Sequence, residues 1–193
     1  LFRSRLADLA DRLADAPARL DLLTHGVNCV RDRLSSRRDT LVRRNDTAAL
    51  RALDLLGALD LSLLTEAELS VLLDTSATAA HLIAERLVDA GLLESPSFGS
   101  YHVPASVRLL ARERRTNPAA GQEAVRRVVD HYVEAVRDRV ADPVAPSPTR
   151  ARSAWYRTHR STLDELSLRD HTDTLHNAVN DLRRGLLDRS GHG

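Results

Sequence analysis

The chain has 193 residues, of which 42% are apolar and 28% are charged, and this composition is typical of a folded globular protein rather than a disordered one. Its formal net charge of +1 excludes the strong positive field on which nonspecific nucleic-acid binding depends. No apolar run of about 18 residues is present, and the first residues carry charges where a signal peptide has its apolar centre. These features predict a cytoplasmic protein with no membrane partner.

The residue types favour helices over sheets. Aromatic residues make up only 3% of the chain, whereas Leu, Ala, Val, Arg and Asp dominate, so we expect a mainly α fold. The sequence contains no Met, which predicts that it begins inside a larger protein. Cys29 is the single cysteine and has no disulfide partner within the chain, and its neighbours Val27 and Val30 predict that it is buried.

Residues 1–45 are predicted to form two short amphipathic helices. In the first, residues 4–14 place leucines at helical spacing along one face. The second is expected to continue from Leu20 to Leu34. The polar run Ser35–Asp39 is expected to end or fray it, and residues 43–46 are expected to form a linker.

Two helices with clear start signals follow. The first is predicted from Thr47 to Leu59, with Asp46 or Thr47 as its N-cap and a leucine stripe as its inner face. The second begins at the run Thr65-Glu66-Ala67-Glu68, a capping box in which the side chains of Thr65 and Glu68 bond to each other's backbone amides. Only two residues, Asp74 and Thr75, separate this helix from the next, as in a helix-turn-helix.

The stretch from Thr75 to Arg114 predicts a helix, a β-hairpin and a further helix. The first helix is capped by Thr75 or Ser76 and ends at Gly91. A strand over 92–94, a turn over 95–100 and a return strand over 101–103 make the hairpin. Pro104 suits the first position of the last helix. Residues 46–115 are therefore predicted to be a winged helix-turn-helix, with three helices and a short β-hairpin.

The remaining residues are predicted to be helical on both sides of a proline-rich linker. A helix from about Ala119 to Val140, within the connecting segment 116–141, carries a broad apolar face. Residues 142–150 contain three prolines and predict an extended linker. Residues 151–193 predict a helical hairpin.

The segment IAERLVDAGLLESPSFGSYHVPASVRLLARER, residues 83–114, resembles the winged-helix domain that follows the nucleotide-binding core in NB-ARC (STAND-type) ATPases. It is most similar to actinobacterial transcriptional regulators of the antibiotic regulatory protein (SARP) family. The matching residues are Leu87, Val88, Asp89, Leu92, Leu93, Glu94, Tyr101, Arg108, Leu109, Ala111, Arg112 and Glu113. Residues 6–23 resemble the end of the helical, ARC-like domain, and residues 155–166 resemble the segment that leads into tetratricopeptide-like repeats.

The resemblance implies a noncatalytic regulatory module. In the family, ATP or ADP is bound by an upstream Walker A loop, and the sequence contains no G-x-x-x-x-G-K-[ST] motif, so we expect no cofactor and no enzymatic activity in these residues. The module would relay the nucleotide state of a larger ATP-dependent transcriptional regulator to its other domains, namely the nucleotide-binding core, the effector and the repeats. A homo-oligomer is also compatible with the sequence.

The family also places a phosphate-sensing histidine at the end of the return strand. Pro104 occupies that position here, and His102 lies two residues earlier on the same strand face. His102 is thus the candidate phosphate sensor, and its alternative role is that of an exposed hairpin histidine. Four arginines are candidates for contact with a neighbouring domain or an acidic partner, namely Arg108, Arg112, Arg114 and Arg115.

Two other classes of function are weighed against this one. A winged helix that reads DNA directly should present Arg, Asn, Gln or Ser from its recognition helix and basic residues from its wing. Residues 76–90 contain Glu85, Arg86 and Asp89, and residues 95–100 contain no Arg, so direct DNA contact is disfavoured. A metal site at His171, Asp173 and His176 is also disfavoured, because their spacing does not bring all three to one helix face.

Overall fold

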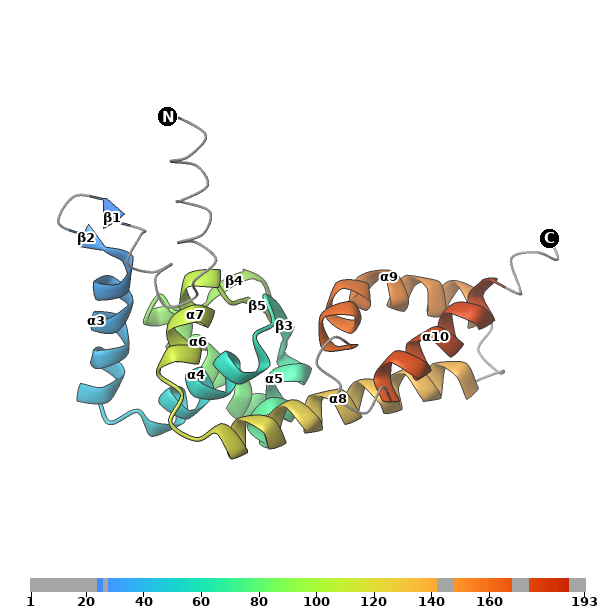
Figure 1. The fold of residues 1–193 in the computed structure, drawn as a ribbon, viewed down its shortest axis with the longest axis horizontal. Helices are drawn as coiled ribbons and strands as arrows, with labels where there is room; N and C mark the ends of the chain where they lie inside the picture. Colours follow the sequence, from blue (N-terminus) through green and yellow to red (C-terminus); the bar gives the residue numbers. More distant parts are fainter. Residues whose placement is uncertain (1–23, 26–27, 142–147, 168–173, 188–193) are drawn as a thin grey trace, which may run out of the picture. The chain divides into compact units, whose positions relative to one another are not determined.

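The computed structural model describes residues 24–25, 28–141, 148–167 and 174–187, and this part of the chain is mainly helical with a small three-stranded antiparallel sheet (Figure 1). The chain divides into two compact units between Ala124 and Val125. The mainly α prediction is therefore confirmed. The helix expected over residues 4–14 lies outside the described residues.

The first described elements differ from the predicted second helix. Strands β1 (Thr24–His25) and β2 (Asn28–Cys29) pair antiparallel where a helix was expected, and helix α3 (Val30–Arg43) begins only after them. This helix continues through the polar run Ser35–Asp39, so the expected end there is wrong. Its buried leucines, Leu34 and Leu41, lie on either side of that run and hold the helix on its neighbours. The side chain of Cys29 lies outside the described part.

Helix α4 (Thr47–Leu59) is the central element of the first unit and has the predicted bounds. The Asp46 carboxylate caps it by accepting a hydrogen bond from the Ala49 amide at 3.0 Å. Most of its apolar side chains are buried, including Leu53, Leu56 and Leu59. The helix ends at Asp60, whose backbone is left-handed (φ 55°) and whose N–H donates to the Leu56 carbonyl.

The predicted capping box is present at the start of helix α5 (Glu66–Leu73). Thr65 Oγ1 accepts a hydrogen bond from the Glu68 amide at 3.3 Å, and the Glu68 carboxylate accepts one from the Thr65 amide. Thr65 also ends a short strand, β3 (Leu63–Thr65), which was not predicted. Three residues carry too little alternation to be recognised as a strand, and β3 exists through its pairing with a segment about 37 residues later.

We expect Thr65→Ala to lower the free energy of unfolding by about 1 kcal/mol, because it removes one half of the capping box. Urea denaturation measures the change. Thr65→Ser keeps the hydroxyl and should retain most of the stability. Thr78→Ala replaces an exposed helical threonine and should be neutral or slightly stabilising. Equal losses from Thr65→Ala and Thr78→Ala would contradict the capping role.

Helix α6 (Ala77–Asp89) and a β-hairpin follow, close to the prediction. Ser76 caps the helix, and Gly91 (φ 67°) follows its end. The hairpin is confirmed, but its first strand, β4 (Glu94–Ser97), begins later than expected because Leu92 and Leu93 fold back and bond to the Leu87 carbonyl.

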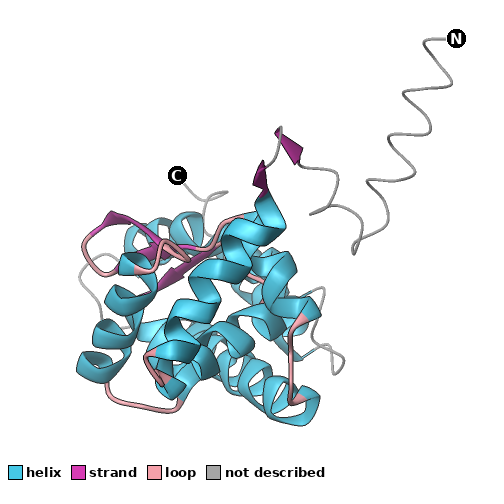
Figure 2. Cartoon of the chain, turned by 90° about the vertical axis from the view of Figure 1, so that its left-hand side faces the viewer, coloured by secondary structure: helices cyan, strands magenta, loops and turns pink. Residues whose placement is uncertain are grey.

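The return strand, β5 (Ser100–His102), lies in the middle of the sheet, whose order is β3-β5-β4. Leu64 pairs with Tyr101, and Glu94 pairs with His102. The turn between β4 and β5 consists of Phe98 and Gly99 alone and is shorter than the predicted turn over 95–100. Gly99 adopts φ 69°, a backbone conformation that is unfavourable for residues with a side chain. Figure 2 shows these strands at the edge of the helices.

Helix α7 (Ala105–Glu113) packs on α4, with its predicted inner face of Val107, Leu110 and Ala111 buried. Pro104 is its N-cap and not its first helical residue. The two helices approach closely at Gly57, where an added Cβ would lie 2.6 Å from the backbone carbonyl carbon of Ala111. Helix α3 also packs on α4 and α7, and it lies in the same compact unit as residues 46–115.

The second unit is helical throughout its described part. Helix α8 (Pro118–Ala141) begins in the first unit and continues into the second, where its predicted apolar face is buried at Val128, Tyr132 and Val136. Helices α9 (Pro148–Ser167) and α10 (Thr174–Leu187) pack together as the predicted hairpin. Because α9 begins at Pro148, the predicted linker over 142–150 is wrong for its last three residues. Among the described helices, none combines the length and apolarity needed to cross a bilayer.

Candidate functional site

A cluster of polar side chains joins helix α6 to the sheet. The His81 Nδ1 atom lies 2.7 Å from the Tyr101 hydroxyl oxygen, and that hydroxyl donates to Glu85 Oε1 at 3.3 Å. His81 Nδ1 also lies 3.7 Å from Glu66 Oε2, at the start of α5. Side chains from α5, α6 and β5 thus meet at one place, and their contacts fix α6 against the hairpin.

The hydrogen bonds in this cluster favour one arrangement of protons. A tyrosine hydroxyl carries one hydrogen, and an ionised carboxylate can only accept. Since Tyr101 donates to Glu85, the Nδ1–H of His81 donates to the Tyr101 oxygen. All three groups are then satisfied, which matters because Tyr101 is only 1% exposed.

The pKa of Tyr101 is raised from its ordinary value of 10.0 to about 12, chiefly by burial and also by the negative charge and hydrogen bond of Glu85 and the charge of Glu66. The neutral phenol is therefore the form that the folded protein holds. The cluster is suited to a structural hydrogen bond and not to an ionised tyrosine acting as a base at neutral pH.

This raised pKa predicts a loss of stability in alkaline solution. Between pH 10 and about 12 the unfolded chain loses the Tyr101 proton while the folded chain keeps it, so the free energy of unfolding falls as the pH rises. The slope from this group approaches about 1.4 kcal/mol per pH unit. Urea denaturation at several pH values measures it. Tyr101→Phe cannot ionise and should flatten the profile, and an unchanged slope would show that Tyr101 is not its source.

His102, the candidate phosphate sensor, is paired with an acid. Its Nδ1 lies 2.9 Å from Glu94 Oε2, across the hairpin on β4. A carboxylate at this distance opposes an approaching phosphate, because both are negatively charged. The following helix, α7, begins at Pro104 without a side-chain cap. The surroundings of His102 therefore fit the alternative role, an exposed hairpin histidine, better than they fit anion binding.

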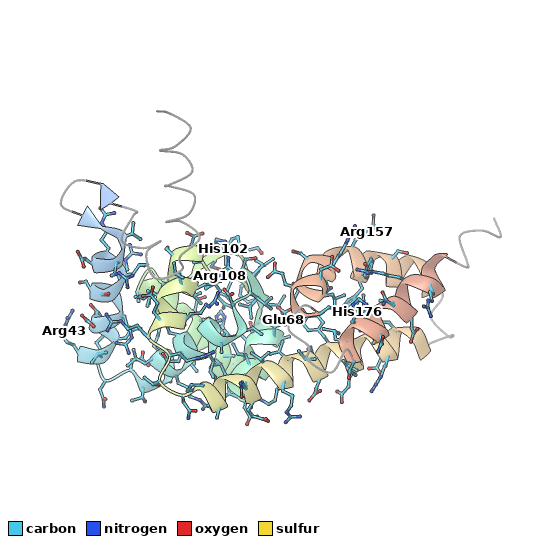
Figure 3. The ribbon with its side chains drawn as sticks, viewed as in Figure 1. Arg43, Glu68, His102, Arg108, Arg157 and His176 are labelled. Carbon is cyan, nitrogen blue, oxygen red and sulfur yellow. The ribbon has the colours of Figure 1, made fainter. Side chains whose placement is uncertain are left out.

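Two of the four candidate arginines are bound within the first unit. Arg108 Nη1 donates to the carbonyl oxygen of Asp60 at 2.9 Å and to its carboxylate at 3.3 Å, and Arg112 Nη1 donates to the other carboxylate oxygen at 3.0 Å. Asp60 ends α4, so these bonds fasten that end of α4 to α7. Figure 3 labels Arg108 on α7 and His102 on β5. Arg108 therefore has a structural role. About half of the Arg112 side chain is exposed.

The other two arginines, Arg114 and Arg115, lie exposed at and after the end of α7. Of the residues considered for metal binding, His176 is exposed on α10, whereas His171 and Asp173 lie outside the described residues. Within the described ranges, no group of three or more His, Cys, Asp or Glu side chains could hold a metal ion.

Sequence reasoning missed the roles of His81 and Asp60. Tyr101 was noted only as a matching residue of the family, and nothing in the sequence indicated that it bonds to a histidine twenty residues earlier. A signal for Asp60 did exist, because an aspartate directly after a leucine-rich helix can adopt the left-handed conformation that ends helices. Its arginine partners, however, lie about fifty residues away.

The outer face of α6 and the hairpin turn carries exposed apolar side chains beside acidic ones. Phe98 is 92% exposed in the turn, and Leu82 is 55% exposed on α6. The one arginine of α6, Arg86, is bound to Asp46 at 2.9 Å. A basic surface for phosphates is absent from this described face.

Comparisons with known proteins do not add to this description. No protein-family model matches the sequence, and no curated protein or solved structure matches it.

Proposed function

We propose that the first unit is a winged helix that acts as a noncatalytic coupling module in an NB-ARC-type transcriptional regulator. The order α4, β3, α5, α6, β4, β5 and the antiparallel hairpin beside α6 support the winged-helix assignment. The resemblance of residues 83–114 to the SARP family supports the regulatory role. In this proposal the module passes the nucleotide state of an upstream ATPase core, which binds ATP or ADP, to other domains of the same protein.

The observation that carries the proposal is the character of the α6 face. In a winged helix that reads DNA, this helix enters the major groove and needs free basic and amide side chains. Here its exposed residues include Ala77, Thr78 and Leu82, and its arginine is paired with Asp46. The hairpin adds Phe98 and an acid, Glu94, and no base from residues 94–101. Such a face suits contact with protein and disfavours contact with the DNA backbone.

Fluorescence anisotropy with a random-sequence duplex tests the alternative, a winged helix that binds DNA directly. The chain is titrated into labelled duplex at low salt and at near-physiological salt. We expect no binding at the higher salt concentration. Micromolar or tighter binding that persists there, and that weakens steeply as salt increases further, would indicate true phosphate contacts and would replace the proposal with the DNA-binding alternative.

The upstream reading frame tests the coupling role directly. We expect the codons that precede Leu1 to encode a Walker A loop of the form G-x-x-x-x-G-K-[ST], because the proposal requires a nucleotide-binding core. Sequencing of the genomic locus tests for this loop, and it requires no purified protein. An open reading frame that starts at Leu1, or an upstream domain without this loop, would contradict the ATPase coupling.

A further inference from the structure

Phe98 is the most exposed large apolar side chain in the described part of the chain. It is 92% exposed, although a hairpin turn of this length is well served by a small polar residue followed by glycine. The centroids of the Phe98 and His81 rings lie 5.9 Å apart, and the ring planes are tilted by 46°. The phenyl group therefore lies next to the polar cluster. A single exposed apolar side chain is ordinary on a protein surface, so Phe98 gains significance only from the exposed and charged side chains near it.

Two carboxylates belong to the polar cluster next to which Phe98 lies, and α6 carries a second exposed apolar side chain, Leu82. Leu82 is 55% exposed and lies three residues before Glu85 on the same side of α6. Glu66 approaches the turn itself, because its amide donates to the Gly99 carbonyl at 2.9 Å and its Oε2 atom would lie 3.9 Å from a Cβ at Gly99. We call Glu66, Leu82, Glu85 and Phe98 the hairpin patch. It combines an exposed phenyl ring, an exposed aliphatic side chain and two acids.

We propose that the hairpin patch binds an arginine-bearing segment of a partner protein. The inference rests on the proposed function, since it names the chemistry of the surface through which the coupling module meets another domain. Charge complementarity supports it, because the patch contains two carboxylates and the adjacent histidine, His81, already bonds to Tyr101. A basic partner is therefore attracted, and an acidic or nucleic-acid partner is repelled.

Arginine fits this surface better than lysine does. A guanidinium group stacks on an aromatic face and can donate to a carboxylate at the same time. The Tyr101 bond uses only Oε1 of Glu85, and a carboxylate has about four acceptor positions in all. The phenyl ring of Phe98 accepts the flat face of the guanidinium group, while Leu82 covers an aliphatic side chain of the same segment.

The test uses the whole chain and three defined peptides. One is an amphipathic helical peptide with arginine and leucine at alternate turns, and the other two replace every arginine by lysine or by glutamate. Binding is followed by amide chemical shifts of the isotopically labelled chain. We expect the arginine peptide to shift the amides around Leu82 and Phe98, the lysine peptide to bind more weakly, and the glutamate peptide to have no effect.

Two variants and one matched control locate the binding. Phe98→Ala and Leu82→Ala should each weaken binding of the arginine peptide by about tenfold or more, since they remove the two exposed apolar side chains of the patch. Val42 on α3 is 48% exposed, which is similar to the 55% exposure of Leu82. Val42→Ala should leave the affinity for the peptide unchanged. Circular dichroism verifies that all three variants remain folded.

The proposal is overturned if the shifted amides lie elsewhere, if Val42→Ala weakens binding as much as Phe98→Ala, or if the glutamate peptide binds as well as the arginine peptide. These outcomes leave the coupling role intact as long as duplex DNA does not bind. Binding of duplex DNA at near-physiological salt would instead refute the proposed function, whatever the peptides do.

Discussion

Replacement of Gly57 by alanine is expected to destabilise the first unit strongly, although alanine favours helices. In an exposed helix the change would stabilise by about 1 kcal/mol. At Gly57 the new Cβ would lie 2.6 Å from the carbonyl carbon of Ala111, 2.7 Å from its Cβ and 2.8 Å from the Arg112 amide nitrogen. Two of these three atoms belong to the α7 backbone and cannot rotate away, so α4 and α7 must separate.

We expect Gly57→Ala to cost about 3 kcal/mol in net free energy of unfolding and to lower the melting temperature by roughly 10 °C or more. Thermal and urea denaturation followed by circular dichroism measure this. Trp155, the only tryptophan, lies in the second unit, and its fluorescence reports that unit separately.

Gly121→Ala provides a graded comparison. Its Cβ would lie 2.9 Å from the Ala58 Cβ, which is also a close contact, but with a side-chain atom near the start of α8. We expect a smaller loss than at Gly57, because the first turn of a helix can shift more easily than two packed helix centres. A stabilising effect of Gly57→Ala would mean that α4 and α7 do not pack as closely as described.

Replacement of Asp60 by alanine is the second change with a large expected effect. It removes the carboxylate that accepts from both Arg108 and Arg112, and it places alanine at φ 55°. Aspartate tolerates the left-handed conformation better than alanine does, because its short polar side chain can hydrogen-bond locally, so the backbone adds a smaller part of the loss. The lost bonds to charged donors add about 1.5–3 kcal/mol. We therefore expect a total loss of about 3 kcal/mol, measured as a lower urea midpoint at unchanged slope.

Asp74→Ala is the matched control. Asp74 ends α5 with φ 54°, so it has the same left-handed backbone, but its side chain is exposed. The difference between the losses of Asp60→Ala and Asp74→Ala isolates the contribution of the two arginines. Asp60→Asn tolerates the conformation and keeps an acceptor oxygen, so we expect an intermediate loss. If Asp60→Ala and Asp74→Ala cost the same, the arginine bonds contribute nothing to stability.

Local signals in the sequence predicted most helix bounds in the first unit. The Asp46 cap, the Thr65 capping box and the Ser76 cap act within three residues, so the sequence alone reveals them. The same locality explains the errors. The run Ser35–Asp39 lacks apolar residues, yet α3 continues through it because Leu34 and Leu41 pack on other helices. Strand β3 was missed because only its pairing with β5 makes it a strand.

The candidate site was predictable in part. His102 was selected by resemblance to a family and the four arginines by their charge, and neither signal reveals which of these side chains already have partners. Arg108 and Arg112 bind Asp60 from one turn apart on α7, and His102 pairs with Glu94 because the hairpin register places them opposite each other. The charge of each residue was known from the sequence, whereas its availability to a ligand depended on the fold.

The sequence by itself determined the helical class, the capped starts of α4, α5 and α6, and the presence of a hairpin near Gly99, because these depend on contacts between near neighbours in the chain. Only the tertiary structure decided which polar groups meet. The bonds of Tyr101 to His81 and of Arg108 to Asp60 join residues that are far apart in sequence. It also decided that Phe98 remains exposed, since burial depends on how whole elements pack and not on the apolar character of a residue.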